Sequence, residues 1–222
     1  MSDYISRLRN LLEQHSDEKT ADWSYAYMKE QFAFFGIKAP LRNALFKQFF
    51  VENTPPQYSE LSDLVWTLWL EPEREFQYFA IELLVKYKKQ WTEDIIELFE
   101  KMIVHKSWWD SVDYISSSLI SLYFKQFPHQ IKPITEGWID TGNMWLQRVC
   151  LIFQLSYRQK TDTELMFKYI CLLNHSKEFF IQKAIGWALR QHARTDADSV
   201  KNFVENTSLA PISKREAMKH IS

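Results

Sequence analysis

Residues 145–157 read WLQRVCLIFQLSY, a stretch that recurs along the chain and decides the fold. Similar stretches are EFQYFAIELLVKY from Glu75, WWDSVDYISSSLI from Trp108 and FIQKAIGWALRQH from Phe180. The four starting points lie 33, 37 and 35 residues apart. Helical repeats of this period cannot bury their apolar faces alone, so they stack on their neighbours. The pattern therefore predicts an all-α protein, an α-solenoid whose repeats share one concave face.

Helical spacing extends beyond these repeats. Apolar residues recur three and four positions apart, as in ISRLRNLLEQH from Ile5. Only four glycines occur in 222 residues, whereas hairpin-rich β folds use glycine in their turns. Asp17 is expected to cap a helix that Gly36 ends, and Pro40 to begin the next one. We expect about a dozen helices in a single domain, residues 1–222.

Composition limits the class of protein. Apolar residues make up 46% of the chain, too many for a disordered protein. Cys150 and Cys171 match neither a metal site nor a disulfide framework, which favours a reducing compartment. The charged N-terminal stretch has no signal-peptide core, and no apolar run has the length of a membrane span. The sequence predicts a soluble cytoplasmic protein without a membrane partner.

The net charge of −1 conceals an uneven distribution. Residues 141–222 hold 12 Lys and Arg against 7 Asp and Glu, whereas the first 140 residues hold 15 against 21. Such an imbalance arises by chance in many proteins. It also allows a basic face, and the local field is what attracts a polyanion.

Three of the repeat helices place an aromatic and a charged residue three or four positions apart. The pairs are Trp109 with Asp113, Trp145 with Arg148, and Lys183 with Trp187. Residues at these spacings share one face of a helix. A tryptophan by itself usually belongs to a core, and an aspartate is often a cap or part of a buried ion pair. The recurrence of the combination favours a site on the concave wall.

Several site chemistries have no counterpart in the sequence. It contains no HExxH, GxSxG, phosphate-binding glycine loop or dinucleotide fingerprint, so neither a metal nor a cofactor is expected. What remains is one carboxylate, flat aromatic faces and cations. These groups suit a reaction that builds positive charge between tryptophans and beside Asp113. Cleavage of an N-glycosidic bond in DNA fits, because its transition state resembles an oxocarbenium ion.

The chain resembles the AlkD-type DNA alkylation repair glycosylases, which have HEAT-like repeats. The segments that carry the resemblance are YMKEQFAFFGIKAP (27–40), EPEREFQ (71–77), KSWWDSVD (106–113), WLQRVCLIFQLSY (145–157), SKEFFIQKAIGWALR (176–190) and LAPISKREAMKHI (209–221). The resemblance implies about six HEAT-like helix pairs with a concave DNA-binding face. It also implies that Asp113, Trp109 and Trp187 form the active cleft, with Arg148 beside the backbone of the lesion.

The implied reaction is removal of N3- and N7-alkylated purines, such as 3-methyladenine and 7-methylguanine, from duplex DNA. No deep base-flipping pocket is implied. The expected partner is double-stranded DNA with alkylated purines, bound by a monomer associated with the nucleoid. Residues expected to contact DNA are Tyr27, Lys38, Arg148, Lys183, Arg190, Lys214 and Arg215.

Some positions depart from the family pattern. Asn43 stands where a basic residue is expected, Ser156 replaces an expected lysine, and Lys38 replaces a neutral amide. The cleft residues are intact. Trp108 is expected to be buried, because adjacent helical residues point about 100° apart and Trp109 faces the cleft. The alternative function is a non-catalytic HEAT-like solenoid that binds DNA structures or protein partners, but the presence of Asp113 with both cleft tryptophans favours the enzyme.

Overall fold

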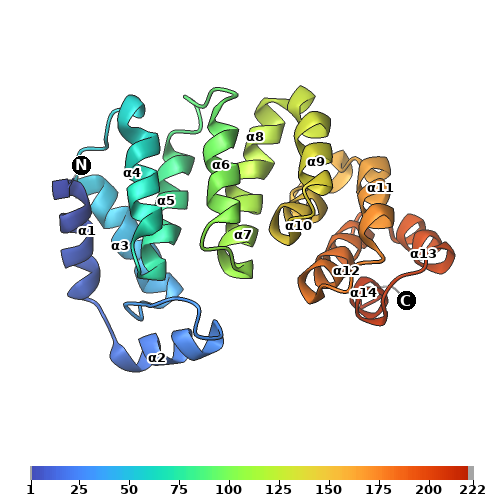
Figure 1. Ribbon diagram of the computed structural model, residues 1–222, viewed down its shortest axis with the longest axis horizontal. Coiled ribbons are helices and arrows are strands. Elements are labelled where there is room, and N and C mark those ends of the chain that lie inside the picture. Colours follow the sequence, from blue (N-terminus) through green and yellow to red (C-terminus); the bar gives the residue numbers. More distant parts are fainter. Residues whose placement is uncertain (1, 220–222) are drawn as a thin grey trace. The chain divides into compact units, whose positions relative to one another are not determined.

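The computed structural model describes residues 2–219, and these residues fold almost entirely into helices (Figure 1). The only β pairing in this range is an isolated bridge between Ala33 and Glu73. The all-α prediction is therefore confirmed. The helices form two compact units, Met1–Trp91 and Thr92–Ser222. The single domain and the shared concave face stay predictions. The last two residues of the 209–221 segment lie outside the described residues.

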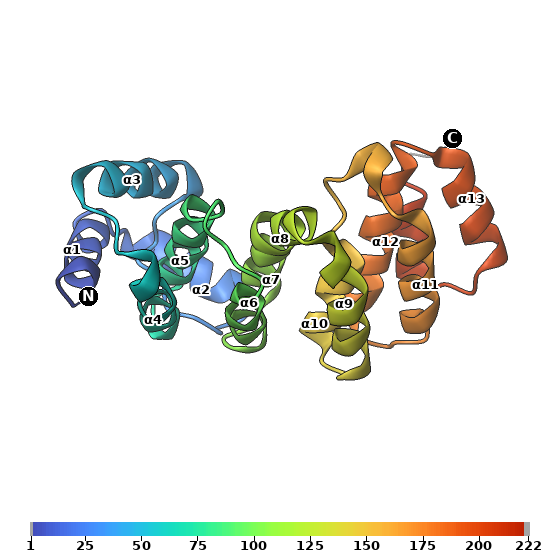
Figure 2. The same cartoon turned by 90° about the horizontal axis from the view of Figure 1, so that it is seen from above.

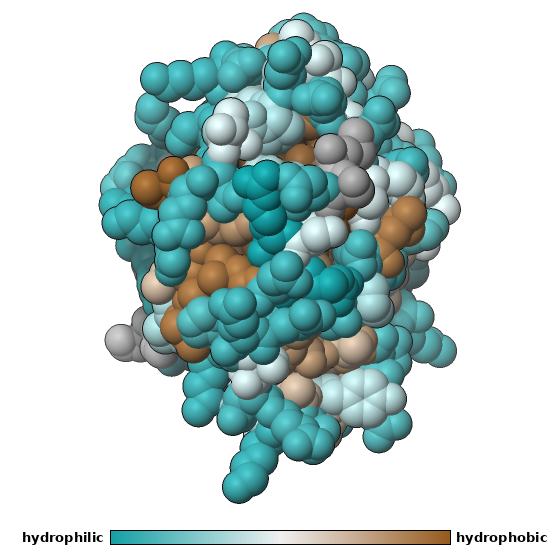
Figure 3. All heavy atoms as spheres, turned by 90° about the vertical axis from the view of Figure 1, so that its left-hand side faces the viewer, coloured by the Kyte–Doolittle hydropathy of each residue, from teal (hydrophilic) through white to brown (hydrophobic). Residues whose placement is uncertain are grey.

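The first unit contains five helices in the described range. They are α1 (Ser2–Glu13), α2 (Glu18–Tyr27), α3 (Ala39–Glu52), α4 (Tyr58–Leu70) and α5 (Arg74–Lys86). In its core, the rings of Phe46 and Phe49 pack edge-on against Phe79, with centroids 5.1 and 5.4 Å apart. By contrast, the surface of this unit is mainly hydrophilic, and hydrophobic residues are visible there only in patches (Figure 3). Edge-to-face aromatic packing is thus a main contact between α3 and α5.

The segment between α2 and α3 differs from the prediction. Asp17 does cap α2, because its carboxylate accepts a hydrogen bond from the Thr20 amide at 2.8 Å. However, α2 ends at Tyr27, so the prediction that Gly36 ends this helix is wrong. Gly36 lies in a loop with φ +84°, and the next helix begins at Ala39 with Pro40 in its first turn. A Cβ at Gly36 would lie 2.1 Å from the carbonyl oxygen of Asp17.

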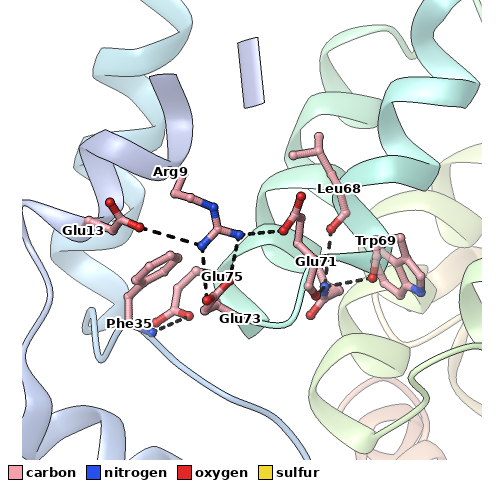
Figure 4. Close-up of polar contacts among 9 residues, drawn as sticks. Arg9, Glu13, Phe35, Leu68, Trp69, Glu71, Glu73 and Glu75 are labelled. Carbon is pink, nitrogen blue, oxygen red and sulfur yellow. Dashed lines mark hydrogen bonds and ion pairs between the residues drawn. The ribbon is translucent and has the colours of Figure 1, made fainter. Parts of the chain in front are cut away.

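A buried carboxylate explains the loop. The backbone amides of Phe35, Gly36 and Ile37 donate to Glu75 in α5, over 3.1 to 3.3 Å. Arg9 reinforces the same region from α1, with hydrogen bonds to Glu71 at 2.6 Å and Glu73 at 3.1 Å (Figure 4). The bonds to Glu75 satisfy three backbone amides of the loop, so the chain does not need to be helical there.

The second unit contains the remaining helices. They are α6 (Ile95–Val104), α7 (Trp109–Ile115), α8 (Ser121–Gln126), α9 (Ile131–Asp140), α10 (Met144–Ile152), α11 (Thr163–Leu173), α12 (Phe179–Ala193), α13 (Ala197–Asn206) and α14 (Pro211–Ala217). Helix α10 packs on α6, α7, α9, α11 and α12, so it lies at the centre of this unit (Figure 2). No helix in the described range is long and apolar enough to cross a membrane.

Helices α7 and α8 form one continuous helix that is interrupted by a π turn, Ser116–Ile120. The Ser121 amide donates to the carbonyl of Ser116, the five-residue spacing that defines such a turn. The Ser116 hydroxyl is buried and has no hydrogen-bond partner among the described residues. Turns of this kind are frequent at functional sites, and this one begins three residues after Asp113.

Helices α12 and α14 approach each other closely at Gly186. A Cβ on this residue would lie 2.5 Å from the Cβ of Glu216 and 2.9 Å from the carbonyl oxygen of Ser213. Trp187 is the next residue in α12. Only a residue without a side chain permits the contact.

We expect Gly186→Ala to lower the free energy of unfolding by about 2 kcal/mol, because the added methyl group overpacks the α12–α14 contact. Denaturant titration followed by circular dichroism measures the change. Gly137→Ala in α9 is the matched control, since no atom lies within 4 Å of a Cβ built there. That variant should gain up to about 1 kcal/mol from helix propensity. Stabilisation by both substitutions would contradict the close contact.

Candidate functional site

A buried ion pair joins two of the residues that the sequence singled out. Arg148 of α10 donates from Nε to Oδ1 of Asp113 at 2.7 Å and from Nη2 to Oδ2 at 2.8 Å. The side chains are 6% and 18% exposed. Two parallel hydrogen bonds between a guanidinium and a carboxylate fix both position and orientation. Asp113 is therefore held rigidly where α7 leads into the π turn.

Arg148 also reaches a third helix. Its Nη1 donates to the backbone carbonyl of Phe180 at 2.5 Å, in the first turn of α12. The guanidinium thus links α7, α10 and α12. The expected contact between Arg148 and a DNA phosphate stays a prediction, and the side chain has three of its five N–H groups engaged within the protein. The geometry directs Arg148 mainly to Asp113.

The Asp113 carboxyl experiences two opposing influences. Burial raises its pKa above the ordinary value of 3.8, while the hydrogen bonds and the charge of Arg148 lower it. Burial is the larger effect. The carboxylate loses its charge as the pH falls through this raised pKa, so it is protonated at a higher pH than an exposed aspartate. The paired geometry is that of the ionised form.

Asp113 and Trp187 border the same pocket, which has a volume of about 520 Å³. The other described residues of its lining are Tyr114, Ser116, Ser117, Ile152, Phe153, Leu155, Ser156, Arg158 and Gln191. The lining combines apolar side chains with hydroxyl, amide and guanidinium groups. The structure thus brings together a carboxylate and an indole at one opening.

The remaining tryptophans occupy other positions. Trp109 lies on α7 one turn before Asp113 and is half-buried, but it is not among the residues that border this pocket. Trp108 precedes α7 in extended conformation, so the 100° argument does not apply to it. Its half-buried ring packs against Trp145 and Phe180, with centroids 6.0 and 5.4 Å apart. Trp108 and Trp145 thus form an aromatic cluster beside the ion pair.

The basic residues of α12 converge on one carboxylate. Glu216 of α14 accepts hydrogen bonds from Lys183 at 2.9 Å and Lys219 at 3.3 Å, and forms an ion pair with Arg190. Its side chain is 7% exposed. Burial lowers the pKa of Lys183, and so do nearby positive charges, Lys219 and Arg190 foremost. More positive than negative charge is therefore concentrated here, although Glu216 neutralises part of it.

The other expected DNA contacts lie in different places. Lys214 and Arg215 are exposed on α14. Tyr27 and Lys38 lie in the first unit, where both border a pocket of about 370 Å³ between α2 and α3. The Tyr27 ring stacks on Trp23 with centroids 5.0 Å apart and planes 10° from parallel. A flat, exposed aromatic surface of this kind can stack on a nucleobase.

Sequence reasoning missed two charged residues of the second unit, Arg158 and Glu216. Arg158 lies just after the repeat segment 145–157, so it has no equivalent position in the other repeats with which it could be compared. Glu216 belongs to a segment without a repeat partner, although its spacing of three from Lys219 was a visible signal. No group of three or more His, Cys, Asp or Glu side chains in residues 2–219 is arranged to hold a metal ion.

Comparison with known proteins shows which family the chain resembles over nearly its whole length. Residues 8–221 match the model of a family described as DNA alkylation repair enzyme. A solved structure described as a predicted DNA alkylation repair enzyme from Enterococcus faecalis is similar to the chain, with 33% sequence identity and a TM-score of 0.87. The similarity covers 93% of this chain and 97% of the other. A search of curated proteins finds no match.

Removal of Arg148 tests the ion pair. We expect Arg148→Ala to lower the free energy of unfolding by about 3 kcal/mol, because Asp113 is left buried without its partner. Denaturant titration measures this change. Lys168→Ala, which breaks the exposed pair with Glu136 in the same unit, is the control and should have little effect. Equal effects of the two substitutions would show that the buried pair is no stronger than a surface pair.

Proposed function

The chain belongs to the family of DNA alkylation repair enzymes, and from its pocket we propose that it is a DNA glycosylase. Its proposed substrates are positively charged N3- and N7-alkylpurines, such as 3-methyladenine and 7-methylguanine, in duplex DNA. The observation that carries the proposal is the buried Asp113 carboxylate, held by Arg148 at the opening that Trp187 also borders. A DNA strand beside this opening would place a sugar near the carboxylate.

The proposed reaction breaks the bond between C1′ of the sugar and the purine nitrogen. The bonding electrons leave with the base, and positive charge develops on C1′ and the ring oxygen. Asp113 stabilises this charge and orients a water molecule, whose oxygen bonds to C1′ while a proton passes to solvent. Because Arg148 fixes the carboxylate beforehand, little reorganisation is needed in the transition state.

The indole of Trp187 has a second role in this proposal. An aromatic face attracts a cation through its quadrupole, and the effect grows when water is excluded. Trp187 lies half-buried beside Asp113, so its face is available to a sugar cation. Trp109, one turn before Asp113 on α7, is assigned the same role.

No second carboxyl group lies among the described residues that line the pocket. Among its described lining residues, Asp113 is the only acid, and it is engaged by Arg148. A neutral base needs a proton in order to leave, whereas an N3- or N7-alkylated purine carries a positive charge and leaves neutral. The pocket is also partly open, which suits a mechanism without deep base flipping and tolerates larger alkyl groups.

The activity would start base excision repair, with duplex DNA as the partner and the monomer as the active form. We assign the basic residues Lys183, Arg190, Lys214 and Arg215 of the second unit and Lys38 of the first, together with the aromatic Tyr27, to contacts with DNA. In the non-catalytic alternative, the Asp113–Arg148 pair would serve the stability of the second unit alone. No specific observation favours that alternative.

Loss of the Asp113 charge should abolish most of the activity. We expect Asp113→Asn to reduce base release at least about 10-fold, the effect of losing one electrostatic stabiliser, while affinity for DNA changes little. Single-turnover release of 7-methylguanine and a binding titration measure the two quantities. Asp140→Asn, at an exposed site at the end of α9, is the control for a lost negative charge. Release at the wild-type rate by Asp113→Asn would rule out the assignment.

The identity of the released bases tests the mechanism most directly. We expect release of 3-methyladenine and 7-methylguanine, and no release of uracil or hypoxanthine, because only the charged bases leave without a proton. Matched duplexes that differ in one base, analysed for free base by chromatography, make the comparison. Comparable rates for uracil and 7-methylguanine would contradict the absence of leaving-group assistance.

A further inference from the structure

Arg158 is the only positively charged residue among the described residues that border the Asp113 pocket. It begins a short 3₁₀ turn, Arg158–Lys160, in the connection between α10 and α11. The connection brings this side chain to the same opening as Asp113 and Trp187, although all three come from different elements. A cation therefore lies at the edge of the proposed reaction site.

The Arg158 guanidinium has no counter-ion among the residues that the structure describes. It is exposed, and it makes no hydrogen bond or ion pair within residues 2–219. The cations nearby differ in this respect, because Arg148 is held by Asp113 and Lys183 by Glu216. Arg158 consequently retains all five of its N–H donors for a ligand.

The backbone at Arg158 is strained. Its φ of +54° lies in the left-handed region, which side-chain-bearing residues other than Asn and Asp rarely adopt. Two hydrogen bonds hold the turn in place, from the Lys160 amide to the Tyr157 carbonyl at 3.0 Å and from the Thr161 amide to the Arg158 carbonyl at 3.1 Å. Glycine would satisfy this turn better. Strained residues of this kind concentrate at functional sites.

We propose that Arg158 binds a phosphodiester group of the DNA strand at the edge of the pocket. The planar guanidinium fork matches two phosphate oxygens, and the neighbouring Ser156 hydroxyl and Gln191 amide can donate further hydrogen bonds from the same lining. This proposal rests on the proposed function, because it identifies the ligand as the backbone of the substrate. It adds a phosphate contact next to the reacting sugar, which would fix the register of the strand.

Arg158→Gly separates binding from stability. The substitution removes the charge and relieves the positive φ, so the thermal unfolding midpoint should stay the same or rise. Affinity for an undamaged duplex should fall, and the slope of log K against log salt should decrease by about one. Arg158→Lys keeps a point charge and should retain most of the slope. Titrations at several salt concentrations measure all three proteins.

Lys160→Ala is the matched control. This lysine is exposed in the same turn but does not border the pocket, so its removal should leave the slope unchanged. Duplexes that carry one uncleavable alkylated purine, and in which one phosphate at a time is replaced by a neutral methylphosphonate, locate the contact. One linkage near the lesion should weaken binding of the wild-type protein and have no effect on Arg158→Gly.

Two outcomes would overturn the proposal. The first is an unchanged slope for Arg158→Gly, and the second is an equal decrease for Lys160→Ala, which would indicate diffuse attraction. Binding is measured without turnover, so it is independent of base release. If the wild-type protein released no alkylated base, but Arg158→Gly still lowered the salt slope, the glycosylase proposal would be refuted and the phosphate contact supported. If the wild-type protein released alkylated bases, but Arg158→Gly left the salt slope unchanged, the phosphate contact would be refuted and the glycosylase proposal supported.

Discussion

The ion pair between Arg148 and Asp113 is the interaction on which the second unit's site depends. A charged group removed from water needs a partner with good geometry, and here the two side chains satisfy each other through two hydrogen bonds. The third hydrogen bond, to the carbonyl of Phe180, extends the link to the helix that carries Trp187. One guanidinium therefore sets the relative positions of a carboxylate and an indole on different helices. Stability and proposed chemistry depend here on the same contact.

The positive charge of residues 141–222 is not all available to a polyanion. Buried Glu216 collects Lys183, Arg190 and Lys219 into one cluster, and Asp113 occupies Arg148. Such pairing orders long side chains and leaves a net positive potential, because the cations outnumber the two carboxylates. Counting charges along the sequence therefore overestimates the number of free cations and does not show where they point. The paired cations contribute a fixed part of the field in the second unit, whereas Arg158 at the pocket has no ion-pair partner among residues 2–219.

The fold was predictable from the sequence because apolar spacing reports which face of each helix is buried. The spacing of four between Trp109 and Asp113 likewise placed both on α7, and a buried pair of Asp113 with an arginine was a stated possibility. What could not be predicted depends on partners far along the chain. Gly36 looked like the end of a helix, but its amide binds Glu75. Arg158 gave no signal, because an arginine in the left-handed region cannot be recognised from its neighbours in sequence.

The π turn at Ser116–Ile120 holds one more residue per turn than the helices on either side of it. In a regular helix each residue advances the direction of the side chain by about 100°. The extra residue therefore changes the angular register between α7 and α8. It allows Asp113 to face the pocket while Tyr123 and Phe124 of the same continuous helix face the core. Deletion of one residue within this turn would restore regular α-helical winding. Either Asp113 would then turn away from the pocket, or Tyr123 and Phe124 would turn away from the core. The turn therefore allows α7 and α8, which form one continuous helix, to contribute side chains to two surfaces that face in different directions.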